Sequence, residues 1–188
     1  MNTLVVYYSY TRNNEKLANL LQRKLGCDLL QIEELKKRTR STIFLDAVFN
    51  RLPAIRTAVH NLKKYDLVVL VAPIWDAKIA SPLKTFILSE KENIANYAFI
   101  TICGGAAGQQ EKVTQQLKSL VGKEPQAVCE LSIDELSRQS KDKSVVYNPD
   151  YILTDEDFGF YDGEISNFLG RAGMPLAPGW QVRHEYGD

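Results

Sequence analysis

The sequence predicts an α/β protein with a doubly wound, five-stranded parallel sheet, and three observations support this. First, short segments rich in Val, Leu and aromatic residues alternate with segments whose apolar residues recur at helical spacing. Second, the short segments are continuously apolar, which is typical of strands buried on both faces. Third, turns of unusual composition follow the first, third and fourth of them, at the sheet edge where such folds bind ligands.

The elements can be assigned in chain order. Strands are predicted at Leu4–Tyr8, Cys27–Ile32, Asp66–Ala72, Tyr97–Cys103 and Gln126–Leu131. The first helix carries leucines at helical spacing and stops at Gly26, and later helices are predicted from Pro82, from about Gln109 to Val121 and from Asp162 to Gly170. The apolar segment from Ile43 to Leu52 follows a basic stretch and is predicted to be a core-packing helix, with contact to a membrane or an anionic partner as the alternative.

The bulk composition limits the class of protein. A chain of 188 residues suits one domain, with a core at about 1–132 and a C-terminal elaboration at 133–188 whose aromatic residues anchor it. Lys plus Arg equals Asp plus Glu at 23 each, so nucleic acid is not an expected partner. No apolar run reaches the roughly 18 residues of a membrane span, and three dispersed cysteines suit a reducing compartment. We therefore expect a cytoplasmic protein without a membrane span or a metal site.

The turn after the first strand is predicted to be an anion site. It contains Ser9, Tyr10, Thr11, Arg12, Asn13 and Asn14 and leads directly into a helix. The free N–H groups and the dipole of a helix N-terminus favour an anion. The turn lacks glycine and matches neither the P-loop nor the dinucleotide motif. The alternation of Ser9, Thr11 and Asn13 indicates a terminal phosphate; in the alternative, an asparagine caps the helix and the other two are ordinary turn residues.

Two further turns follow the third and fourth strands. The first contains Pro73, Ile74, Trp75, Asp76, Ala77 and Lys78, and the second contains Cys103, Gly104, Gly105 and Gly108. A planar aromatic such as Trp75 can cover a flat ligand, and glycines allow close approach of the backbone. The alternatives are that Trp75 is a core aromatic and that Cys103 is an inert packing residue.

These three turns, in this order, resemble those of the flavodoxin family, and the resemblance runs from about Leu4 to Leu131. It implies a sheet of order 2-1-3-4-5 and a bound FMN. The phosphate would lie in the first turn and the flavin ring between the other two. Trp75 would then cover one face of the ring, while the glycine turn would donate hydrogen bonds to its polar rim.

Three departures from the family pattern are informative. Asn14 stands where family members commonly carry Thr, and Asp76 and Ala77 stand where glycine is frequent. In electron carriers that glycine accepts positive φ when the turn rearranges, whereas Ala77 is expected to avoid this conformation. The zero net charge also differs from strongly acidic carriers. The sequence therefore favours two-electron chemistry over one-electron shuttling.

The functional prediction is an FMN-binding oxidoreductase. It would pass electrons from a nicotinamide or a reduced partner to a quinone-like or protein acceptor, and the sequence leaves a homo-oligomer open. The alternatives are a dedicated one-electron-carrier flavodoxin and a cofactor-free regulatory or interaction domain of the same fold. No residue is predicted to act as a catalytic acid or base.

Overall fold

The computed structural model describes residues 1–36, 51–56, 61–105, 108–139 and 151–174. Its elements, in chain order, are β1 (Thr3–Tyr7), α1 (Asn13–Leu25), β2 (Asp28–Gln31), β3 (Glu33–Glu34), β4 (Ile55–Arg56), η1 (Leu62–Lys64), β5 (Leu67–Val71), β6 (Ile74–Trp75), β7 (Lys78–Ile79), α3 (Ser81–Glu90), η2 (Lys91–Asn93), β8 (Tyr97–Cys103), α4 (Gln110–Val121), β9 (Val128–Ser132), α5 (Ile133–Gln139), α6 (Asp155–Phe160) and α7 (Asp162–Arg171).

The main sheet has five strands in the order β2-β1-β5-β8-β9, and every neighbouring pair is parallel. Counted along the main sheet, this is the predicted order 2-1-3-4-5, and the predicted fold class is confirmed. The three inner strands β1, β5 and β8 are buried along their whole length, which explains their continuous apolar sequences.

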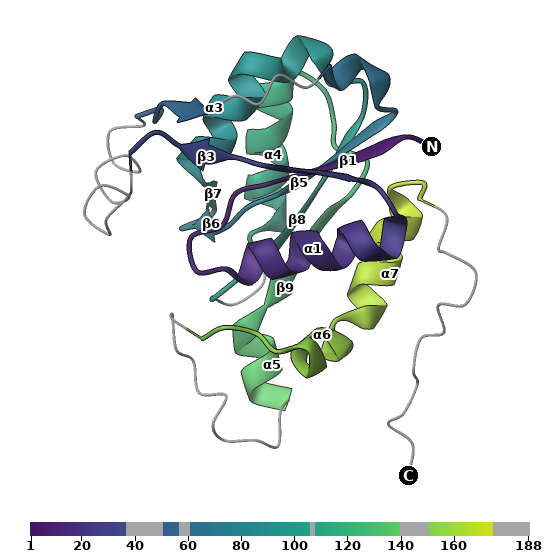
Figure 1. Ribbon diagram of the computed structural model, residues 1–188. Coiled ribbons are helices and arrows are strands. Elements are labelled where there is room, and N and C mark those ends of the chain that lie inside the picture. Colours follow the sequence, from purple (N-terminus) through teal and green to yellow (C-terminus); the bar gives the residue numbers. More distant parts are fainter. Residues whose placement is uncertain (37–50, 57–60, 106–107, 140–150, 175–188) are drawn as a thin grey trace.

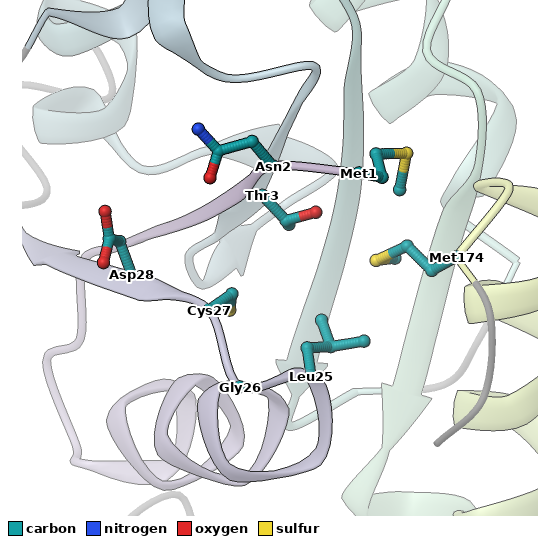
Figure 2. Close-up of a pocket in the computed structure, with 8 residues that line it drawn as sticks. All are labelled: Met1, Asn2, Thr3, Leu25, Gly26, Cys27, Asp28 and Met174. Atoms are coloured by element: carbon teal, nitrogen blue, oxygen red, sulfur yellow. The ribbon is translucent and has the colours of Figure 1, made fainter. Parts of the chain in front are cut away.

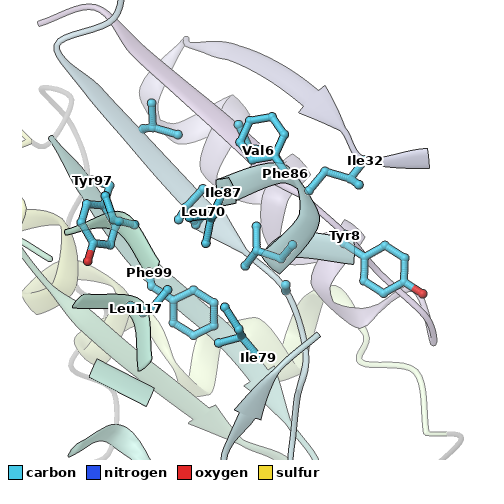
Figure 3. Packing of buried hydrophobic residues seen from close by; sticks show 14 of the residues in the cluster. Val6, Tyr8, Ile32, Leu70, Ile79, Phe86, Ile87, Tyr97, Phe99 and Leu117 are labelled. Carbon is cyan, nitrogen blue, oxygen red and sulfur yellow. The ribbon is translucent and has the colours of Figure 1, made fainter. Parts of the chain in front are cut away.

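Helices cover both faces of the sheet (Figure 1). α3 and α4 pack on one face, where their apolar side chains join those of alternate strand residues in one buried cluster. Figure 3 shows part of this cluster, in which Phe86 and Ile87 of α3 meet Val6 and Leu70 of the sheet. Side chains alternate across a strand, so neighbouring strand residues pack on opposite faces.

The other face is covered by α1 and by the C-terminal helices α6 and α7. Leu17 and Leu21 of α1 and Phe158 and Ile165 of the C-terminal helices belong to the same buried cluster. The Tyr161 hydroxyl also donates to the backbone carbonyl of Ser132 at 2.7 Å. The C-terminal aromatics Phe158 and Tyr161 are thus buried anchors, as predicted.

α1 ends as its sequence predicts. Its C-cap Gly26 has φ 60°, and its N–H donates to the carbonyl of Gln22. Glycine adopts this left-handed conformation without the cost of a Cβ atom, so the helix stops there.

The structure also contains elements that the sequence did not predict. β3 pairs antiparallel with β4, and β6 pairs antiparallel with β7 in a short hairpin at the carboxyl end of β5. Most of the helix predicted at Ile43–Leu52 lies outside the described residues; residues 51 and 52 are described, and they are exposed and not helical. No helix in the described part of the chain is long and apolar enough to cross a membrane.

Candidate functional site

The turn between β1 and α1 presents unpaired backbone donors. Arg12 is the N-cap of α1 with φ 72°, and no side chain caps the helix. The first backbone bond of the helix runs from Lys16 N–H to the Arg12 carbonyl at 2.9 Å. Among the described residues, none accepts a hydrogen bond from the N–H groups of 13–15. The alternative interpretation, in which Asn13 or Asn14 caps the helix, is therefore wrong.

Asn13 and Asn14 are buried and bind other parts of the backbone. Asn13 Nδ2 donates to the Tyr151 carbonyl at 2.7 Å, and its Oδ1 accepts from Leu153 N–H at 2.9 Å. Asn14 makes a similar pair of hydrogen bonds with Ile102: it accepts from the Ile102 N–H at 2.9 Å and donates to the Ile102 carbonyl at 3.1 Å. Each carboxamide thus joins the start of α1 to a distant segment. The amide of Asn13 has two N–H donors, and the hydrogen bond to Tyr151 uses one of them.

Ser9 offers a buried hydroxyl to this turn. Its Oγ is shielded from solvent and has no hydrogen-bond partner in the structure. Buried polar atoms are nearly always paired, so an orphan hydroxyl in the same turn as the free N–H groups is a candidate donor to a polar ligand. The exposed side chain of Arg12 forms an ion pair with Glu15, with 3.6 Å between Nε and Oε2.

The turn after β5 folds back as the β6–β7 hairpin. Trp75 pairs with Lys78, which leaves Asp76 and Ala77 as a two-residue connection with φ 50° and 56°. The expectation that Ala77 avoids positive φ is wrong, because both residues of a two-residue hairpin loop of this type need it. The Trp75 ring is half-buried and meets the Tyr10 ring edge-on, at 6.4 Å between centroids. Lys78 is exposed.

The third turn begins at Cys103, which is buried. Burial first, and then the negative charge of Glu130 and Glu135, raises the pKa of the Cys103 thiol to about 12. The thiol is therefore neutral at physiological pH and is not a nucleophile. Gly108 has φ 108°, a backbone angle that glycine alone adopts readily, and its N–H donates to Glu130 Oε2 at 3.1 Å.

The three turns surround a cavity of about 440 Å³ at the carboxyl ends of the inner strands. Its lining contains ten of the sixteen predicted residues, namely Thr11, Asn13, Asn14, Pro73, Ile74, Trp75, Asp76, Cys103, Gly104 and Gly105. The predicted residues outside the lining are Ser9, Tyr10, Arg12, Ala77, Lys78 and Gly108. Ile102, Gln109 and Ile133 also line the cavity without having been predicted. Ile102 was recognisable as the penultimate residue of a strand, whereas nothing local marked the other two.

A smaller cavity of about 160 Å³ lies at the opposite end of β1 (Figure 2). It is lined by Met1, Asn2, Thr3, Leu25, Gly26, Cys27, Asp28 and Met174. Parallel α/β sheets bind ligands at the carboxyl ends of their strands, so the larger cavity is the candidate site. In the described part of the chain, no group of three or more His, Cys, Asp and Glu residues is arranged to hold a metal ion.

The sheet order and the position of the cavity define a flavodoxin-like α/β protein. Residues 1–132 match the model of the NADPH-dependent FMN reductase family. Since this match covers well over half of the chain, the protein belongs to that family. The predicted resemblance is therefore confirmed for the fold, while the family that matches is that of the FMN reductases. FMN, the predicted cofactor, is the flavin for which the family is named.

Solved structures agree on the fold. A flavoprotein from Lactobacillus acidophilus NCFM, solved in complex with FMN, superposes with a TM-score of 0.61 at 21% identity, covering 74% of this chain and 99% of that one. A protein from Bacteroides eggerthii DSM 20697 gives a TM-score of 0.61 at 21% identity, covering 77% of this chain and 92% of its own. Comparison with curated protein sequences returned no match.

Proposed function

We propose that the protein binds FMN in the 440 Å³ cavity and uses it as an NADPH-dependent oxidoreductase. The observation that carries the proposal is the junction of this cavity with the unpaired donors at the start of α1. Family membership supports both the flavin and the nicotinamide. When bound, FMN supplies the redox chemistry, because no protein side chain transfers a hydride.

The residues of the first turn fit the phosphate group. The N–H groups of 13–15 and the hydroxyl of Ser9 are donors without partners, and Thr11 lies in the cavity wall. A phosphate offers several strong acceptor oxygens, and the positive end of the α1 dipole favours its charge. This set would bind the phosphate through hydrogen bonds and would not need a cationic side chain.

The other two turns fit a flat, partly apolar ring. Ile74, Trp75 and Ile133 supply apolar and aromatic surface, and Gly104 and Gly105 supply exposed backbone. The neutral Cys103 thiol adds no charge to the wall. These residues would orient the ring and exclude water from one side of it. The zero net charge of the chain favours a flavoenzyme with small acceptors, such as quinone-like molecules, over a carrier that docks on basic proteins.

Titration of the purified protein with FMN, riboflavin and NADPH tests the proposal. We expect FMN to bind with quenched fluorescence and riboflavin to bind more weakly, since it lacks the phosphate. We also expect NADPH to bleach the flavin absorbance under anaerobic conditions, and a quinone to restore it. Equal affinity for FMN and riboflavin would refute the phosphate site, and failure of NADPH to reduce the bound flavin would refute the reductase activity.

A further inference from the structure

The turn between β6 and β7 has a composition that does not stabilise its conformation. Ile74 pairs with Ile79 and Trp75 with Lys78, so Asp76 and Ala77 alone reverse the chain. Both have positive φ. Turns of this geometry favour Asn-Gly or Asp-Gly, because a residue with a Cβ atom is strained in the left-handed region. Asp tolerates this region, but Ala has no side chain that compensates for the strain. The turn therefore needs support from outside the hairpin.

Two glutamines of the α4 region supply that support: Gln109, the N-cap of α4, and Gln116 within the helix. Gln109 Oε1 accepts from the Ala77 N–H at 2.7 Å, and Gln116 Oε1 accepts from the Ile79 N–H at 2.8 Å. The two residues are seven positions apart, about two helical turns, so they share a face of the helix. Both are half-buried. Together these two glutamines bind the backbone of the turn and of β7, which follows it, and we call the pair the clamp.

Glu130 of β9 fixes the base of this clamp. Its Oε2 accepts from the N–H groups of both Gly108 and Gln109, each at 3.1 Å. A carboxylate at a helix N-terminus is also favoured by the helix dipole. The backbone of Gln109 is thereby fastened to the main sheet while its side chain reaches the hairpin. Gln109 thus connects the β6–β7 hairpin to β9 by hydrogen bonds.

The clamp acts on the wall of the cavity. Trp75, Asp76 and Gln109 all line the cavity, and the clamped N–H of Ala77 follows directly in the chain. We propose that Gln109 and Gln116 are positioning residues, which hold the Asp76–Ala77 turn in its left-handed conformation and thereby set the position of Trp75 in the flavin site. The identity of the ligand rests on the proposed function, whereas the clamp itself does not.

Hydrogen exchange in the flavin-free protein tests the clamp directly. In Gln109→Met the Ala77 amide should exchange about tenfold faster, and in Gln116→Met the Ile79 amide should do the same, because each loses its acceptor. Gln109→Glu keeps an acceptor at the same reach and should restore protection. Gln115→Met is the matched control, since Gln115 is an exposed residue of the same helix. Unchanged exchange in both methionine variants that lose an acceptor would overturn the proposal.

Flavin titration tests the effect on the wall. Gln109→Met should weaken FMN and riboflavin by the same factor, because the ring and not the phosphate contacts this wall. Ala77→Gly removes the strain of the turn, so in that background Gln109→Met should have a smaller effect on both flavins. Unchanged riboflavin affinity despite faster exchange would refute the positioning of Trp75. If the wild-type protein bound neither flavin, the proposed function would fail while the exchange data would still decide the clamp.

Discussion

Replacement of Asn13 by alanine should destabilise the protein far more than its position at a helix start suggests. Its carboxamide bonds the Tyr151 carbonyl at 2.7 Å and the Leu153 N–H at 2.9 Å, and the residue is 3% exposed. Alanine removes both of these hydrogen bonds, and the loss of a buried partner costs about 1–3 kcal/mol each time. The better helix propensity of alanine returns roughly 0.5 kcal/mol. We therefore expect a net loss of about 1.5–5.5 kcal/mol in the free energy of unfolding.

Urea unfolding and thermal melting measure this loss. For a chain of this size, a loss of about 1.5–5.5 kcal/mol corresponds to a fall in Tm of roughly 3–22 °C. Asn19→Ala is the matched control: its Nδ2 donates to the Glu15 carbonyl one turn back in the same helix, at 2.9 Å, and it should cost less than about 1 kcal/mol. A loss for Asn13→Ala no larger than that for Asn19→Ala would show that the bonds to Tyr151 and Leu153 contribute nothing and would refute the reasoning.

Three further predictions concern the cavity. Thr11→Ala should weaken FMN by about 1.5–3 kcal/mol, the value of a charge-assisted hydrogen bond, and leave riboflavin unchanged; a fluorescence titration that shows equal losses would remove Thr11 from the phosphate site. Trp75→Ala should restore flavin fluorescence and weaken both flavins by roughly 1–3 kcal/mol, as for other stacked rings; a variant that only unfolds more easily would identify Trp75 as a core residue. The pKa of Cys103 is raised from 9.0 to about 12 on folding, so its contribution to stability is complete below pH 9 and is lost as the pH rises toward 12. Urea unfolding at increasing pH should show this decline, and Cys103→Ala should make it shallower without removing it, because burial raises the pKa of the Cys129 thiol to about 12 as well; parallel curves for the two proteins would contradict the assignment.

Much of the fold follows from local sequence. Short, continuous apolar runs rich in β-branched residues, such as Leu67–Val71, are typical of buried strands, and Gly26 marks the end of α1 because the stop needs positive φ. Parallel strands with helical crossovers then leave few sheet orders. The sequence carries no direct information on strand pairing, so the predicted order came from the resemblance of the three turns to those of the flavodoxin family, and it is confirmed.

The candidate site was harder to predict because its decisive contacts are distant. The side chain of Asn13 makes hydrogen bonds with residues 138 and 140 positions away in the sequence. Nothing in the sequence near Asn13 indicates this pair of hydrogen bonds. The β6–β7 hairpin was missed because its turn lacks glycine, and Ala77 is held by Gln109 from 32 positions away. The local propensity of alanine disfavours positive φ at Ala77, but the hydrogen bond from the Ala77 N–H to Gln109 supports this conformation. Sequence reasoning located the three turns but not what supports them.

Because the C-terminal segment packs on α1, the part of the chain that must fold together is longer than the part that matches the family, which we call the module. The family match ends at residue 132, yet Asn13, Lys16 and Lys24 of α1 each bind a partner beyond that point, the last through an ion pair to Asp162 at 3.3 Å. Leu153, Phe158 and Ile165 also complete the buried cluster on this face. A chain cut at the module boundary would expose that cluster and aggregate, since bared apolar faces associate. Any transplant or fusion of this module should therefore carry the residues up to 174, and a substitution in the C-terminal segment will be felt at the start of α1.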